Sequence, residues 1–224
     1  MLEESARAGG PVGTGWIGGM LAGLALLALA APPVAAADEP PAAAVAEARV
    51  TADRLGGELR ALLLDELKRG GPAAALEACA GSAQRATDGV ALATGHRVRR
   101  VSLRPRNPRN EPRPTERAVL VELEPLARAG AMPAERIWIE SDEAGRELLY
   151  LRPIQAGAVC LGCHGPADRL SPEVRAGLAR HYPGDRAVGH QEGDLRGAIV
   201  VRLPLVDPPP PSPPSAPQPE GASR

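Results

Sequence analysis

The chain has 224 residues, of which 26 are basic and 27 are acidic, so that its formal net charge is −1. This balance argues against nucleic acid as a partner, because nucleic-acid-binding surfaces carry an excess of lysine and arginine. Aromatic residues account for only 2% of the chain and phenylalanine is absent, so that a hydrophobic core has to be built from leucine, valine, isoleucine and alanine.

Residues 1–37 have the layout of a secretory signal peptide. An almost wholly apolar run extends from Trp16 to Ala31, and an Ala-Ala-Ala cleavage site precedes Asp38. Cleavage is the favoured interpretation. The alternative is an uncleaved anchor, which would associate the protein with the membrane. In either case we expect the remainder of the chain to be exported and therefore periplasmic.

Two helices are predicted next, separated by glycine and proline at residues 70–72. Apolar residues recur at roughly helical spacing over residues 43–68. An alanine-rich stretch over residues 72–94, which contains Cys79, predicts the second helix. Glycine ends the first helix and proline begins the second.

The chain then carries short strand patterns and two further helical patterns. Alternating apolar and polar residues predict strands at 98–103 and 136–140, and the turn at 142–145 predicts a return strand at 147–152. A final strand is predicted at 197–203, after a second turn at residues 193–194. Helices are predicted at 115–129, with Thr115 as the N-cap, and at 171–181. Because helices precede antiparallel strands, the pattern predicts an α+β fold with one sheet and its helices on one side. Residues 207–224 are proline-rich and are predicted to be disordered.

The most specific motif is C-L-G-C-H at residues 160–164, a C-x-x-C-H run typical of covalent attachment of a c-type haem. Two thiols at this spacing can each add to one vinyl group of a porphyrin, and the histidine then lies under the iron. A zinc site would need two further ligands, and the chain has no second C-x-x-C. A thioredoxin-like pair would open a helix, whereas glycine and proline follow the motif at once. We predict one haem c, held by Cys160 and Cys163, with His164 as an axial iron ligand. Haem c is attached on the exported side of a bacterial membrane, in agreement with the signal peptide.

Haem iron has a second axial position, and few residues are available to fill it. The candidates are Cys79, His96, His181, His190 and Met132. Each histidine has the alternative role of a surface or turn residue, and nothing around Met132 distinguishes it. An odd cysteine in an exported protein indicates a reactive thiol or a ligand, whereas the alternative for Cys79 is a small buried apolar side chain.

Between Ala74 and Pro204 the sequence resembles a family of c-type haem proteins of unknown function, whose domain is PAS-like and carries a single haem. The matching segments occur in order at 75–79, 98–102, 106–110, 150–154, 160–165, 182–189 and 192–197. The resemblance implies a PAS-like antiparallel sheet of about five strands with N-terminal helices packed on it. It also implies that Cys79 is the second axial iron ligand. One departure is His190, where the family commonly carries an aromatic residue.

These observations divide the chain into four parts, which are the signal peptide at 1–37, an N-terminal helix at 38–71, a PAS-like haem c domain at 72–206 and the tail at 207–224. Arginine is frequent in the stretch that follows the second helix, and guanidinium pairs well with carboxylate. The resemblance also suggests that arginines of this stretch neutralise the haem propionates, and Arg100 and Arg106 are predicted to make these contacts. The alternative for both is a solvated loop.

The motif and the resemblance predict an exported haem protein that senses redox state or a small ligand. The alternative function is a small monohaem electron carrier. Enzymatic activity is not expected, because nothing in the sequence marks an acid or base beside an open iron site. The expected partner is a redox or signalling protein of unknown identity, and a second copy of the chain is also a candidate partner.

Overall fold

The computed structural model describes residues 39–143 and 145–205. The predicted signal peptide at 1–37 and the predicted tail at 207–224 lie outside these residues. None of the helices within the described ranges combines the length and the apolar character that a membrane span requires.

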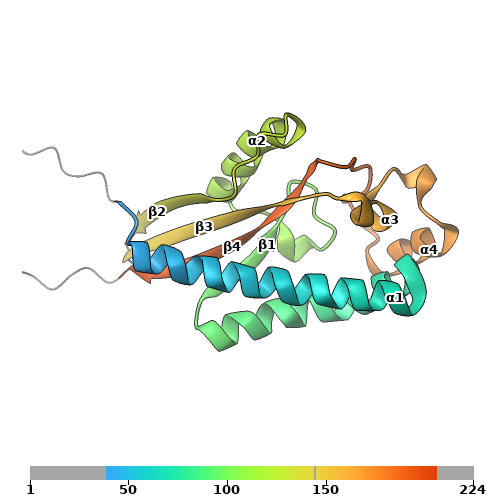
Figure 1. The fold of residues 1–224 in the computed structure, drawn as a ribbon, viewed down its shortest axis with the longest axis horizontal. Coiled ribbons are helices and arrows are strands. Elements are labelled where there is room, and N and C mark those ends of the chain that lie inside the picture. Colours follow the sequence, from blue (N-terminus) through green and yellow to red (C-terminus); the bar gives the residue numbers. More distant parts are fainter. Residues whose placement is uncertain (1–38, 144, 206–224) are drawn as a thin grey trace, which may run out of the picture. The chain divides into compact units, whose positions relative to one another are not determined.

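Helix α1 (Ala42–Thr94) is a helical hairpin rather than one continuous rod. Gly70 and Gly71 leave helical geometry, and Gly71 has a φ of 70°, which glycine adopts readily because it has no side chain. Pro72 then begins the second limb. The first limb (residues 42–69) and the second limb (residues 72–94) lie side by side in Figure 1. This confirms the predicted break at residues 70–72.

Four strands form one antiparallel sheet within the described residues. They are β1 (Arg97–Val101), β2 (Arg136–Asp142), β3 (Gly145–Gln155) and β4 (Leu195–Leu205). Their order across the sheet is β1-β4-β3-β2, so that the last strand in the chain is an interior strand. All four strands coincide with predicted ones. The fifth strand implied by the resemblance is not present in the described residues, where the sheet has four strands.

Helices cover both faces of the sheet (Figure 1). On one face, Tyr150 and Val201 pack with Leu55 of α1. On the other face, Leu151 and Val200 pack with α2 (Pro114–Arg128). Adjacent residues of β3 and β4 are therefore buried on opposite sides. The prediction of helices on one side only is wrong, because the continuous apolar runs of the two interior strands need cover on both faces.

Helix α2 begins one residue earlier than predicted. Pro114 occupies its first position, where the fixed φ of proline suits a helix and its missing N–H is not needed. The N-cap is therefore Arg113, whose backbone N–H donates to the side chain of Glu116 at 2.8 Å. Thr115 lies inside the helix and is not the cap, so that this part of the prediction is wrong.

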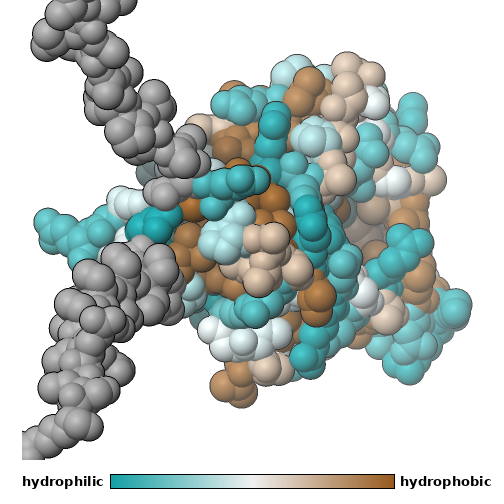
Figure 2. Space-filling model, turned by 60° about the vertical axis from the view of Figure 1, so that its left-hand side comes forward, coloured by the Kyte–Doolittle hydropathy of each residue, from teal (hydrophilic) through white to brown (hydrophobic). Residues whose placement is uncertain are grey.

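The short helices α3 (Leu161–His164) and α4 (Pro172–His181) lie beyond the end of the sheet, next to the tip of the hairpin (Figure 1). Helix α3 follows a 3-10 turn at Ala158–Cys160, and α4 is capped by Ser171 in the region where a helix was predicted. Leu76 of the second limb packs against α4 and the turn before it. On the face shown in Figure 2, hydrophilic and hydrophobic side chains are interspersed.

Candidate functional site

The C-x-x-C-H run forms a helical turn at the hairpin tip. Cys160 ends the 3-10 turn, and the next four residues form α3. Residues three and four apart share one side of a helix, so that Cys160 faces the same way as Cys163 and His164. All three cysteines of the chain are free thiols. The local fold therefore presents two thiols and one imidazole together, as the spacing predicts.

The ring of His164 is held in a defined tautomer. Its Nδ1 donates to the backbone carbonyl of Ala187 at 2.8 Å. Its Nε2 accepts from Nε of Arg196 at 3.4 Å, and because a guanidinium can only donate, Nε2 carries a lone pair. Burial lowers the pKa of His164 well below its usual value, and the nearby Arg196 and Arg106 lower it further. His164 is thus a neutral imidazole whose Nε2 is available to a metal.

The segment of residues 185–190, which we term the clamp, fixes the motif from outside. The backbone N–H of His190 donates to the carbonyl of His164, and that of Gly189 donates to the carbonyl of Gly165, both at 2.8 Å. Oδ1 of Asp185 accepts from the N–H of Ala187 at 2.8 Å. The clamp therefore orients both the imidazole and the backbone of the axial candidate, which is how outer contacts position a metal ligand.

His190 of the clamp is only 1% exposed and its ring lies edge to face with that of His164, with 6.1 Å between centroids. Its Nδ1 accepts from Arg104 at 2.7 Å. Burial, followed by Arg104 and Arg196, lowers the pKa of His190 to about 4. His190 is thus a buried neutral side chain that packs against the candidate ligand rather than a surface residue.

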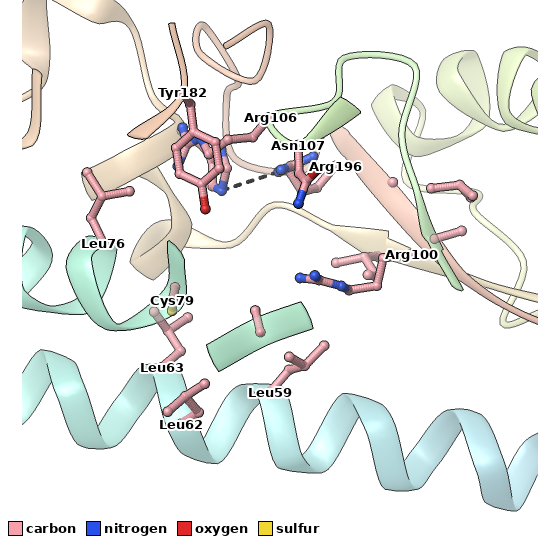
Figure 3. Close-up of a pocket in the computed structure, with 16 residues that line it drawn as sticks. Leu59, Leu62, Leu63, Leu76, Cys79, Arg100, Arg106, Asn107, Tyr182 and Arg196 are labelled. Atoms are coloured by element: carbon pink, nitrogen blue, oxygen red, sulfur yellow. Dashed lines mark hydrogen bonds between the residues drawn. The ribbon is translucent and has the colours of Figure 1, made fainter. Parts of the chain in front are cut away.

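A largely apolar cavity lies between the hairpin, the sheet and the motif, in the form of two adjoining hollows. The sheet-side hollow is bounded by Leu59 and Leu62 of the first limb and by Arg100 of β1. The motif-side hollow is bounded by Pro72 and by the two motif cysteines, Cys160 and Cys163. The hollows share six lining residues, Leu63, Leu76, Cys79, Arg106, His164 and Arg196. The leucines and Cys79 can be followed in Figure 3.

Cys79 projects from the second limb into the shared part of this cavity (Figure 3). Burial raises the pKa of its thiol, an effect that Arg100 opposes. Burial also raises the pKa of Cys163, which Arg106 opposes. Both sulfurs are therefore in surroundings that favour the neutral thiol.

The other candidates for the second axial position lie elsewhere. The ring of His96 forms a hydrogen bond with the hydroxyl of Thr51 at 2.8 Å, and the ring of His181 forms one with the carboxylate of Glu77 at 2.6 Å. Met132 packs in the cluster under α2. Of the five candidates, all within the described part of the chain, Cys79 alone lines either hollow together with His164.

The two predicted propionate contacts have different surroundings. Arg106 forms a buried ion pair with Asp185 at 3.1 Å and stacks over the ring of Tyr182, 5.9 Å from its centroid. Arg100 extends from β1 into the sheet-side hollow, and its Nε is buried without a hydrogen-bond partner. Arg196 of β4 was not among the predicted site residues. It shares the cavity with them but lies 32 residues beyond His164, and the matching segment at 192–197 that contains it gives no role for its side chain.

The fold and the site together define a class, an α+β protein in which a helical hairpin closes an apolar cavity over a sheet and a thiol–imidazole motif. The chain belongs to the Tll0287-like family, whose model, described as Tll0287, matches residues 38–204. A similar solved structure is the crystal structure of the cyanobacterial heme-protein Tll0287. It is 25% identical in sequence with a TM-score of 0.55, over 76% of this chain and 100% of that one. No curated protein matches the chain. The expected membership of a haem-protein family is confirmed at this level, while its PAS-like character stays a prediction.

Proposed function

We propose that this chain is an exported protein that binds one covalent haem c and senses redox state or a small ligand. The observation that carries the proposal is that the Nε2 lone pair of His164 and the thiol of Cys79 line one apolar cavity beside the paired thiols. The similarity to a cyanobacterial heme-protein supports it. Bound haem would supply a one-electron couple or a site for a diatomic ligand.

The residues of the cavity fit this cofactor. Cys160 and Cys163 would hold it through thioether links, each formed by addition of S–H across one vinyl group. His164 is already neutral and oriented, which is the state that a metal requires. The leucines of the first limb, Leu59, Leu62 and Leu63, are only partly buried and form an apolar wall of the cavity. They would contact the face or edge of a porphyrin.

The two axial candidates are supported unequally, and this favours sensing over plain electron transfer. His164 is fixed by the clamp through hydrogen bonds to its ring and its carbonyl. Cys79 sits in surroundings that raise the pKa of its thiol. Protonation would weaken Cys79 as a ligand, whereas His164 would stay in place. An electron carrier is the alternative, and it requires that both ligands remain in both oxidation states. The partner would be a redox or signalling protein in the periplasm, and no enzymatic activity is proposed.

Spectroscopy of the full chain made in a host with cytochrome c maturation tests the proposal. We expect the mass of the chain to increase by one haem and the oxidised protein to be low-spin. CO should bind to the reduced protein if Cys79 is released. A reduced protein that stays low-spin and does not bind CO would favour the electron carrier. A colourless product with the mass of apoprotein would contradict haem binding altogether.

Replacing His164 with alanine is expected to abolish the low-spin spectrum while the haem stays covalently attached, because the thioether links do not depend on the imidazole. The His181→Ala variant is the matched control, since His181 pairs with Glu77 and lines neither hollow. The measurement is the absorbance spectrum of both variants. A low-spin spectrum unchanged by His164→Ala would remove this residue from the iron.

Replacing Cys79 with alanine is expected to shift the Soret band and raise the reduction potential. A thiolate neutralises part of the charge on Fe(III) and so favours the oxidised state. Spectroelectrochemistry of the variant beside the wild type measures both effects. A spectrum identical to that of the wild type would mean that Cys79 is a buried apolar side chain only.

A further inference from the structure

The cavity contains more positive charge than the protein neutralises. Three guanidinium groups line the sheet-side hollow, from Arg100, Arg106 and Arg196. Arg106 is paired with Asp185 and also donates to the carbonyl of Cys163. The other two have no carboxylate within ion-pair distance among the described residues. Arg196 contacts only the neutral Oγ of Ser102, at 3.1 Å, and Nε2 of His164, while Nε of Arg100 has no partner.

Burial lowers the pKa of both unpaired guanidinium groups. Burial, followed by the nearby charge of Arg106, lowers the pKa of Arg196 to about 10. A buried cation without a partner destabilises the protein that holds it. An anion in the cavity would remove this destabilisation, and a carboxylate accepts the paired N–H groups of a guanidinium particularly well.

We propose that Arg100 and Arg196 form a carboxylate-binding pair at the sheet-side end of the cavity. This proposal rests on the proposed function, because the carboxylates that the pair would bind are the two propionates of the porphyrin. Arg196 therefore takes the place that the sequence assigned to Arg106, whose charge is already neutralised by Asp185.

The pair also defines one orientation for a porphyrin in the cavity. The cysteine thiols bound the motif-side hollow, Arg100 bounds the sheet-side hollow, and His164 and Cys79 lie in the part that the hollows share. A macrocycle that carries vinyl groups toward one edge and propionates toward another matches this order, with its iron in the middle. The guanidinium pair thus selects one orientation of the porphyrin before any thioether forms.

Binding of free porphyrins to the full chain with Cys160→Ser and Cys163→Ser tests the pair without covalent attachment. In this background Arg100→Met and Arg196→Met are each expected to weaken binding of protohaem about tenfold, the size of one charge-assisted hydrogen bond. Binding of protohaem dimethyl ester, which has no carboxylates, should change less than about twofold, because its apolar contacts and axial ligands do not involve the two guanidinium groups. The lysine variants at both positions should recover part of the loss. Arg54→Met, which removes an exposed cation paired with Glu58, is the control and should change neither affinity.

The ester also shows whether a variant still folds, because it needs the apolar cavity and not the charges. Equal losses for both porphyrins, or no loss for protohaem, would overturn the pair. If the chain binds neither porphyrin, the proposed function fails, and the carboxylate-binding pair is then tested by the effect of succinate on the melting temperature. A rise in melting temperature with succinate that disappears in Arg100→Met and Arg196→Met would support a site for free dicarboxylates, and the absence of any rise would overturn it.

Discussion

A chain with serine at both Cys160 and Cys163 is expected to lose its haem completely on acid–acetone extraction, whereas the wild type should keep it. The two thiols share one side of the turn that ends in α3 and bound the same hollow. Serine has nearly the same shape but does not form a thioether. The result is read from the mass of the denatured chain and from the colour of the pellet.

Single variants make this test sharper. Cys160→Ser or Cys163→Ser alone should leave one thioether, and the mass of one haem should remain on the chain at reduced yield. Cys79→Ser is the control, since Cys79 lies on the second limb and not in the motif. Extraction of the haem from Cys79→Ser, or its retention by the double variant, would contradict the assignment of the three cysteines.

The Gly197→Ala variant is expected to be less stable than the wild type by about 4 kcal/mol, from strain and overpacking together. Gly197 has a φ of 154°, and a Cβ atom there would lie 2.3 Å from the carbonyl oxygen of Val101. That oxygen belongs to the backbone of β1, which pairs with β4 and has little freedom to move. A loss of this size is a large fraction of the stability of a single domain.

Gly57→Ala is the matched control. Gly57 lies in the first limb, and a Cβ atom there would have no neighbour within 4 Å. Alanine has the higher helix propensity, so that this variant should gain about 0.5–1 kcal/mol. Denaturant unfolding followed by circular dichroism gives both values. A Gly197→Ala chain within about 1 kcal/mol of the wild type would mean that β1 and β4 separate easily at this point.

The features that could be predicted from the sequence are those with a local cause. The turn at residues 70–72 follows from glycine and proline. Strands β1 and β2 follow from alternation, and β3 and β4 follow from short apolar runs next to turns. The grouping of Cys160, Cys163 and His164 follows from helical spacing alone. Cys79 could be named as a candidate ligand because it is the one cysteine outside the motif, although only the resemblance implies that it is the second axial ligand.

The features that sequence reasoning missed depend on tertiary contacts. The carbonyl of Ala187 that fixes the His164 ring belongs to an apolar residue with no chemical signature. Arg196 is one arginine among many, and only the pairing of β4 brings it to the cavity. The sequence does not distinguish Arg106 from Arg100 as a candidate propionate contact, because the ion pair between Arg106 and Asp185 forms only in the folded chain. The position of α2 on the opposite face was missed because alternation shows which residues are buried but not which helix covers them.

The position of β4 has a consequence for the order of assembly. β4 is the last strand within residues 39–205 and lies between β1 and β3, so that β1 has no neighbour in the sheet until β4 arrives. It also supplies Arg196, which means that the cavity wall is completed by the final residues of the domain. In a chain that emerges from its N-terminus, the thiols of the motif are exposed before this wall exists. Closure of the cavity and completion of the sheet therefore coincide, and both depend on the arrival of β4.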